Sequence, residues 1–190
     1  MISDYLTPQN QSSNATVPVR DRVEEQDMQI LANINQAECK ANCGFVAMRV
    51  FHYLENKTFQ PILYDEFHAP APLSTLTVYG KLDDMYLGKK TLRLELFEGD
   101  HDDLIFSCEQ KLFEMKQNAH AIVSFSYQVA GEERGHFFNI YRNESTYKII
   151  DAINAMAFDR YAVCKNLSEY FHIKLPRVGA ETLTKIQLIH

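Results

Sequence analysis

The sequence contains no tryptophan, no excess of basic residues and no long apolar run. Bulky packing therefore depends on 12 Phe and 10 Tyr. The formal charge of −6 argues against nucleic acid as the main partner, because phosphate binding needs clustered Lys and Arg. No window approaches the roughly 18–20 apolar residues that a membrane-spanning helix requires. We therefore expect a protein without a membrane span.

The N-terminus also lacks the basic-then-apolar order of a secretory signal peptide. The expected location is cytoplasmic, unless the chain is exported by another route. The four cysteines are Cys39, Cys43, Cys108 and Cys164, and without a signal peptide they are expected to be free thiols. No motif indicates a cofactor or a metal, and nothing in the sequence indicates the oligomeric state.

A chain of 190 residues with 46% apolar residues is long enough for one domain with its own core. Residues 1–24 are polar and irregular, and they cannot bury enough apolar surface to offset their ordering entropy. We interpret them as a flexible leader and residues 25–190 as a single catalytic domain.

Apolar periodicity predicts helices first and an antiparallel sheet afterwards, which is an α+β domain. The predicted helices are 24–34, 43–54, 103–117 and one near 158–171, and the predicted strands are 120–129, 136–142, 145–151 and 183–189. Residues 92–97 are a strand or the end of a helix, residues 99–103 an acidic turn, and residues 131–135 a polar loop.

Two of these strands predict a hydrogen-bonded pair of side chains. Runs 136–142 and 145–151 are separated by only two residues, and a two-residue turn would place His136 directly opposite Asp151. Opposed residues share a face of the sheet, with Cβ atoms about 4.5–5.5 Å apart. The carboxylate would then reach the Nδ1–H of the imidazole and fix its tautomer, as the acid of a catalytic triad does.

The helix from Cys43 predicts an activated thiol. Asn42 is a favoured N-cap residue, so Cys43 would lie in the first turn. The partial positive charge of a helix N-terminus and a nearby imidazolium would both lower the pKa of the thiol. Gly44 adds no side chain beside the sulfur, and the backbone N–H of Cys43 is free to stabilise an oxyanion.

The chain order Cys43, His136, Asp151 resembles that of papain-like cysteine enzymes. Within that superfamily the chain is most similar to bacterial effector and toxin glutamine deamidases. The likeness rests on four stretches: 42–44, 135–139, 147–151 and 184–189. It implies a helical N-terminal part with the nucleophile at a helix N-terminus, packed on an antiparallel sheet that carries His and Asp. Gln36 and Asn42 are the candidate oxyanion side chains, although Gln36 lies seven residues before the cysteine where such proteases usually have six.

The resemblance implies deamidation of a glutamine side chain in a target protein, possibly a host protein, through an acyl-enzyme on Cys43. It also implies export without a signal peptide and action in the cytosol of a target cell. A thiol protease and a non-catalytic protein-binding module on the same scaffold remain alternatives. Cys39 is a rival nucleophile without a helix behind it, and Cys39 with Cys43 lacks the second close ligand pair of a zinc site.

Overall fold

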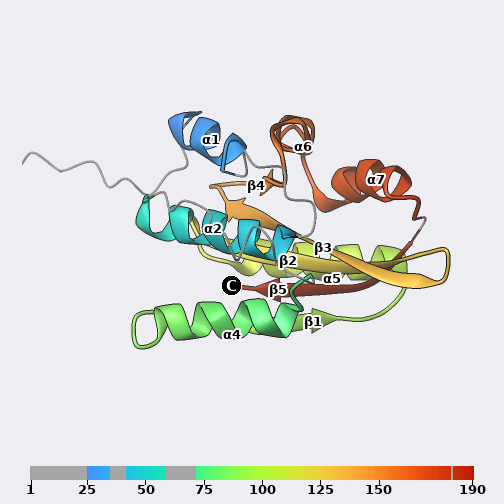
Figure 1. Ribbon diagram of the computed structural model, residues 1–190, viewed down its shortest axis with the longest axis horizontal. Helices are drawn as coiled ribbons and strands as arrows, with labels where there is room; N and C mark the ends of the chain where they lie inside the picture. Colours follow the sequence, from blue (N-terminus) through green and yellow to red (C-terminus); the bar gives the residue numbers. More distant parts are fainter. Residues whose placement is uncertain (1–24, 35–41, 59–71, 181) are drawn as a thin grey trace, which may run out of the picture.

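The computed structural model describes residues 25–34, 42–58, 72–180 and 182–190, so the expected leader 1–24, Gln36 and Cys39 lie outside the described residues. Within these ranges six helices and five strands form an α+β fold (Figure 1). The helices are α1 (Glu25–Ala32), α2 (Cys43–Asn56), α4 (Thr75–Tyr86), α5 (His101–Glu114), α6 (Ala155–Tyr161) and α7 (Leu167–Arg177). The strands are β1 (Leu94–Phe97), β2 (His120–Val129), β3 (Glu132–Arg142), β4 (Tyr147–Ile150) and β5 (Leu183–Ile189).

The five strands form one antiparallel sheet in the order β1-β5-β2-β3-β4. The antiparallel sheet and the α+β class are confirmed, and the bounds of β2 and β5 are those that the sequence predicts. β2 and β3 pair along the whole of β2, from His120 opposite Tyr141 to Val129 opposite Glu132. β4 is much shorter and pairs only with the last four residues of β3.

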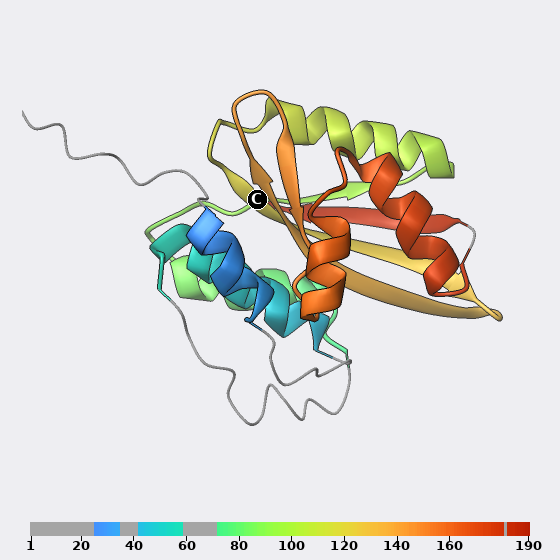
Figure 2. The same cartoon turned by 90° about the horizontal axis from the view of Figure 1, so that it is seen from above.

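Helices cover both faces of the sheet (Figure 2). α2 and α4 pack with side chains such as Ile122 and Phe137 on one face. α5 and α7 pack with Val123 and Phe138 on the other face. Because successive side chains of a strand point to opposite faces, both faces of the sheet are apolar and the core has two layers.

The start of β3 and the region of α6 and α7 differ from the prediction. Residues 132–135 belong to β3 and not to a loop, because the turn consists of only Ala130 (φ 52°) and Gly131 (φ 83°), a two-residue hairpin turn of the kind that needs two positive φ angles. The single helix expected near 158–171 is two helices, α6 and α7. Asn166 starts the second by accepting a hydrogen bond from the backbone N–H of Glu169.

Helix α4 was not expected. Its N-cap Ser74 accepts a hydrogen bond from the backbone N–H of Thr77 at 3.1 Å. Its buried residues Val78, Leu82 and Tyr86 follow helical spacing and pack against α2. The expected acidic turn at 99–103 lies partly inside α5, which begins at His101.

Candidate active site

Cys43 is the first residue of α2, as predicted, and Asn42 is its N-cap. Both residues are buried. The backbone carbonyl of Asn42 accepts the N–H of Val46 at 3.0 Å, while within the described residues the Asn42 side chain makes no capping hydrogen bond to the helix. As in any α-helix, the backbone N–H groups of the first turn point out of the N-terminal end, and Cys43 lies at that end of α2.

Gly44 has a packing role in addition to the open approach expected from it. A Cβ at this position would lie 3.2 Å from Leu73 Cβ and 3.2 Å from Val78 Cγ2. These distances are tighter than ordinary van der Waals contact. The missing side chain thus lets the start of α2 pack closely against α4.

The predicted register between the His and Asp strands is wrong by two residues. Arg142 pairs with Tyr147, which leaves a four-residue loop at 143–146 in place of a two-residue turn. Asp151 therefore follows the end of β4 diagonally from His136 and not directly opposite it. A slip of two residues keeps every side chain on its original face, so the two side chains still meet.

The imidazole of His136 binds Asp151 through Nε2, which lies 3.0 Å from Oδ1 and 3.0 Å from Oδ2. The expected contact through Nδ1 is wrong, because the ring approaches the carboxylate from a diagonal position. Phe125, directly opposite His136 on β2, packs its ring edge against the imidazole at 5.7 Å between centroids. The carboxylate thus occupies Nε2, and Nδ1 makes no hydrogen bond to Asp151.

The thiol of Cys43 lies beside the imidazole of His136, close enough for each group to shift the pKa of the other. Burial raises the pKa of Cys43, but the hydrogen bond and the charge of His136 outweigh burial and lower the pKa below its usual value. The backbone of Phe137 also bonds the sulfur and lowers the pKa, as an N–H donor to a thiolate does. The geometry thus favours a thiolate.

The two other members of the site have shifted pKa values that fit this arrangement. Burial lowers the pKa of His136, but the charge of Asp151 and its hydrogen bonds raise it to about 9. Burial raises the pKa of Asp151, but His136 and Lys174 hold it well below the usual range. Both shifts favour a thiolate–imidazolium pair over a neutral thiol and imidazole, with an ionised carboxylate behind the ring.

Two side chains of α7, which the sequence analysis missed, complete the surroundings of Asp151. Tyr170 Oη donates to Oδ2 at 2.9 Å, and Lys174 Nζ donates to the same oxygen at 2.9 Å. A signal for one of them is present in the sequence. Lys174 occupies the apolar stripe of α7 that Leu167, Tyr170, Phe171 and Leu175 define at three- and four-residue spacing.

Asn139 was also missed, although it lies in the stretch around His136. Its Nδ2 donates a 3.0 Å hydrogen bond to the backbone carbonyl of Ala47, one turn after Cys43 in α2. The side chain is buried between β3 and α2. This bond fixes the helix that carries the thiol against the strand that carries the imidazole.

The other described cysteines lie elsewhere. Cys108 and Cys164 are free and buried, and burial raises the pKa of both. Among the described residues, no group of three or more His, Cys, Asp or Glu side chains is placed to hold a metal ion. In the same residues, none of the helices combines the length and the apolar character that crossing a bilayer would take.

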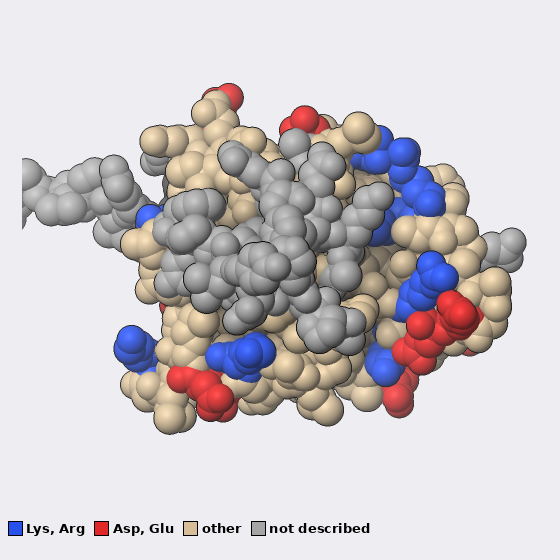
Figure 3. Space-filling view, in the orientation of Figure 1, with Lys and Arg blue, Asp and Glu red and all other residues tan. Residues whose placement is uncertain are grey.

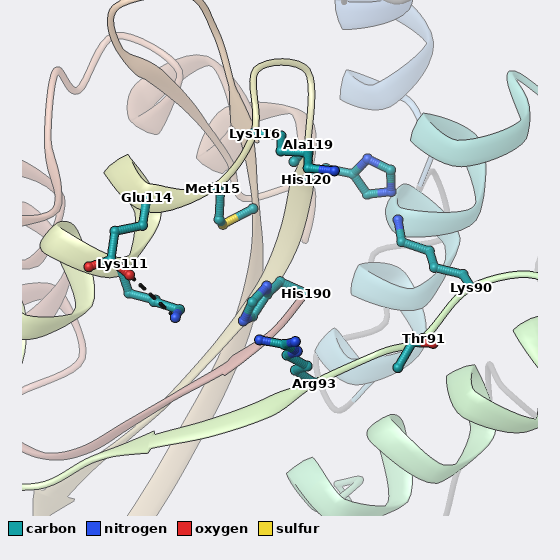
Figure 4. A pocket seen from close by; sticks show the side chains of 10 residues that line it. All are labelled: Lys90, Thr91, Arg93, Lys111, Glu114, Met115, Lys116, Ala119, His120 and His190. Carbon is teal, nitrogen blue, oxygen red and sulfur yellow. Dashed lines mark ion pairs between the residues drawn. The ribbon is translucent and has the colours of Figure 1, made fainter.

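A cavity of about 480 Å³ lies away from Cys43, His136 and Asp151. Figure 4 shows that it is bordered by basic side chains from several elements, among them Lys90, Arg93 and Lys111. Lys90 contacts Glu55 at 2.8 Å and Lys111 contacts Glu95 at 3.1 Å, so carboxylates offset much of this charge. On the face drawn in Figure 3, several Lys and Arg side chains likewise stand beside Asp and Glu, whereas a group of them at the upper right does not.

Comparison with models of protein families found no match for this chain, and comparison with curated proteins found no similar sequence.

Proposed function

We propose that this chain is a papain-like cysteine amide hydrolase that deamidates a glutamine side chain of a target protein. One observation carries the proposal: the thiol of Cys43, at the first turn of α2, lies beside His136, whose Nε2 is 3.0 Å from the buried carboxylate of Asp151. Nucleophile, base and orienting acid in hydrogen-bond contact are the arrangement that acyl transfer by a cysteine requires.

In the proposed reaction the Cys43 thiolate attacks the carbonyl carbon of the amide, and the carbonyl oxygen becomes an oxyanion. The imidazolium of His136 gives its proton to the amine nitrogen, and the C–N bond breaks to release ammonia and leave a thioester on Cys43. Water then gives a proton to His136 as it attacks the thioester. The C–S bond then breaks, which releases a carboxylic acid that loses its proton to solvent as glutamate and restores the thiolate–imidazolium pair.

The oxyanion needs hydrogen-bond donors at the start of α2. The backbone N–H of Cys43 is one of the helix-start N–H groups without a partner inside the helix, and the partial positive charge there favours an anion. Asn42, next to the nucleophile, is the described side-chain candidate for a second donor. Gln36, the other candidate, lies outside the described residues.

The same chemistry on a backbone amide would be proteolysis, with an amine as leaving group in place of ammonia. The deamidase reading rests on the resemblance of the stretches around Cys43, His136 and Asp151 to bacterial effector deamidases. By the same resemblance, the chain would leave its cell without a signal peptide and act on a host protein in the cytosol of a target cell.

The test is to incubate a cell lysate with the wild-type protein and, in parallel, with Cys43→Ala, and to compare the peptides by mass spectrometry. The expected result is a gain of about one dalton at particular glutamines of intact proteins, seen only with wild type. New chain termini that depend on Cys43 would show a protease. No difference between the two samples would contradict both enzymatic readings and favour a binding module.

A further inference from the structure

A buried lysine lies on the sheet-facing side of α7. Lys174 is only 7% exposed, among apolar neighbours such as Phe171 and Leu175. Moving an ammonium group out of water costs several kcal/mol unless a counter-charge is close. Its Nζ contacts Asp151 Oδ2 at 2.9 Å, and it also lies 5.1 Å from the centroid of the Tyr161 ring. The position therefore depends on the carboxylate that orients His136.

The carboxylate of Asp151 is completely enclosed, with no exposed side-chain surface. Oδ1 faces His136, and Oδ2 receives His136, Tyr170 and Lys174, at 2.9 to 3.0 Å in each case. Donors from two elements, β3 and α7, thus hold the carboxylate. With this many short contacts Asp151 cannot turn away from the imidazole without breaking bonds to the helix.

The charges of the cluster also balance only when the lysine is counted. Thiolate and carboxylate contribute two negative charges, and imidazolium and ammonium contribute two positive charges. Without the ammonium of Lys174, the remaining thiolate, carboxylate and imidazolium would carry a net charge of −1, and His136 would hold its proton more tightly. An imidazolium that cannot release its proton cannot act as the base that activates water.

We propose that Lys174 and Tyr170 are positioning residues of the candidate active site: they hold Asp151 against His136 and offset its charge, so that the imidazole can both give and take a proton. This inference rests on the proposed function and deepens it. It assigns to α7, an element outside the Cys–His–Asp arrangement, the control of proton transfer in amide hydrolysis.

Among the residues that the structure describes, few other titratable groups face this cluster. They are Cys43 from α2, Tyr161 from α6 and Tyr127 from β2, which faces Cys43. The pKa values of Tyr127, Tyr161 and Tyr170 are all raised above the usual value, chiefly by burial. The groups of this cluster whose protonation an alkylation profile follows are therefore Cys43 and His136.

The experiment measures the rate of alkylation of Cys43 by iodoacetamide from pH 5 to 10, in the full chain, with peptide mass spectrometry to assign the site. The wild-type profile should have two inflections, one for the thiol and a later one for the imidazolium. Removing a nearby cation favours the protonated form of both groups. In Lys174→Met both inflections should therefore move up by about one pH unit.

Two variants of α7 and one neighbouring lysine complete the design. Lys174→Arg keeps the charge and should retain the wild-type inflections. Tyr170→Phe removes one donor but no charge, and should move them in the same direction by less. Lys165→Met removes an exposed lysine just before α7 and is the matched control, with no shift expected because solvent screens its charge.

A folded Lys174→Met protein with the wild-type profile would overturn the inference and leave the proposed function intact. If Lys174→Met does not fold, Tyr170→Phe provides the test. An alkylation profile of Tyr170→Phe with the wild-type inflections would then overturn the inference. A wild-type profile with a single inflection at the usual thiol value, about 8.5, would instead contradict the proposed function itself.

Discussion

Cys43 and Cys108 are both buried thiols on helices, packed against opposite faces of one sheet, yet their surroundings give them opposite character. Cys43 is the first residue of α2 and contacts His136. Cys108 lies in the middle of α5, where burial and the charges of Glu109 and Glu95 raise its pKa far above the usual value. Burial alone therefore does not decide the direction in which the pKa of a thiol shifts. The position in the helix and the charge beside the sulfur do.

Cys164 sharpens the comparison, because its exposure is close to that of Cys43. The two residues are 6% and 9% exposed. The pKa of Cys164 is nevertheless raised, by burial and by the charge of Glu169. A higher reactivity of Cys43 than of Cys164 that disappears when His136 is removed would thus report the chemistry around the sulfur.

The largest effect on stability is expected from Asp151→Asn, which removes the anion around which the Cys43 region is built. Lys174 would become a buried charge without a counter-charge, so unfolding free energy should fall by about 3–5 kcal/mol. The pKa of Asp151 is depressed, so its contribution is present above the unfolded value of 3.8 and is lost as the pH falls through the folded value. Urea titrations at pH 7 and pH 3 should therefore show that the difference in unfolding free energy between wild type and Asp151→Asn is smaller at pH 3.

The matched control for that prediction is Asp159→Asn, at an exposed position of α6. It makes the same chemical change without touching the cluster and should alter stability by less than about 0.5 kcal/mol. Equal effects of the two substitutions would mean that the interactions around Asp151 add nothing to the stability of the fold.

A smaller effect is expected when the same substitution, Cys→Ser, is made in the two contrasted regions. Cys108→Ser places a hydroxyl in an apolar cluster and should destabilise the protein by about 1–3 kcal/mol. Cys43→Ser keeps a partner in His136 and should leave stability within about 1 kcal/mol while abolishing turnover. Thermal melts measure the stability of the two variants, and the lysate assay measures turnover. A Cys43→Ser protein less stable than Cys108→Ser would contradict the contrast between the two thiols.

Much of the candidate site was predictable because its residues lie in segments with clear apolar periodicity or at a helix start with a favoured N-cap residue. The apolar stripe from Cys43 and the N-cap at Asn42 predict the start of α2, and β2 follows from its apolar run. The pairing of His136 with Asp151 was predicted on the right face although the register was wrong. A loop that gains two residues conserves the face, whereas a gain of one would have reversed it.

What could not be predicted depends on contacts between distant elements. Tyr170 and Lys174 contact Asp151 because α7 packs over β3. The periodicity of a helix does not predict which strand it packs against. The choice of Nε2 over Nδ1 follows from the diagonal approach of the ring, which is a tertiary detail. The hydrogen bond from Asn139 to Ala47 joins residues 92 positions apart and is equally hidden in the linear sequence.

The most direct test compares how fast iodoacetamide labels Cys43 and Cys164 at pH 6.5, in wild type and in His136→Ala. If His136 makes the thiol of Cys43 a thiolate, Cys43 should react at least about 100-fold faster in wild type, and the ratio should approach one in the variant. Equal labelling in wild type, or a preference for Cys43 that survives the loss of His136, would contradict this account of the site.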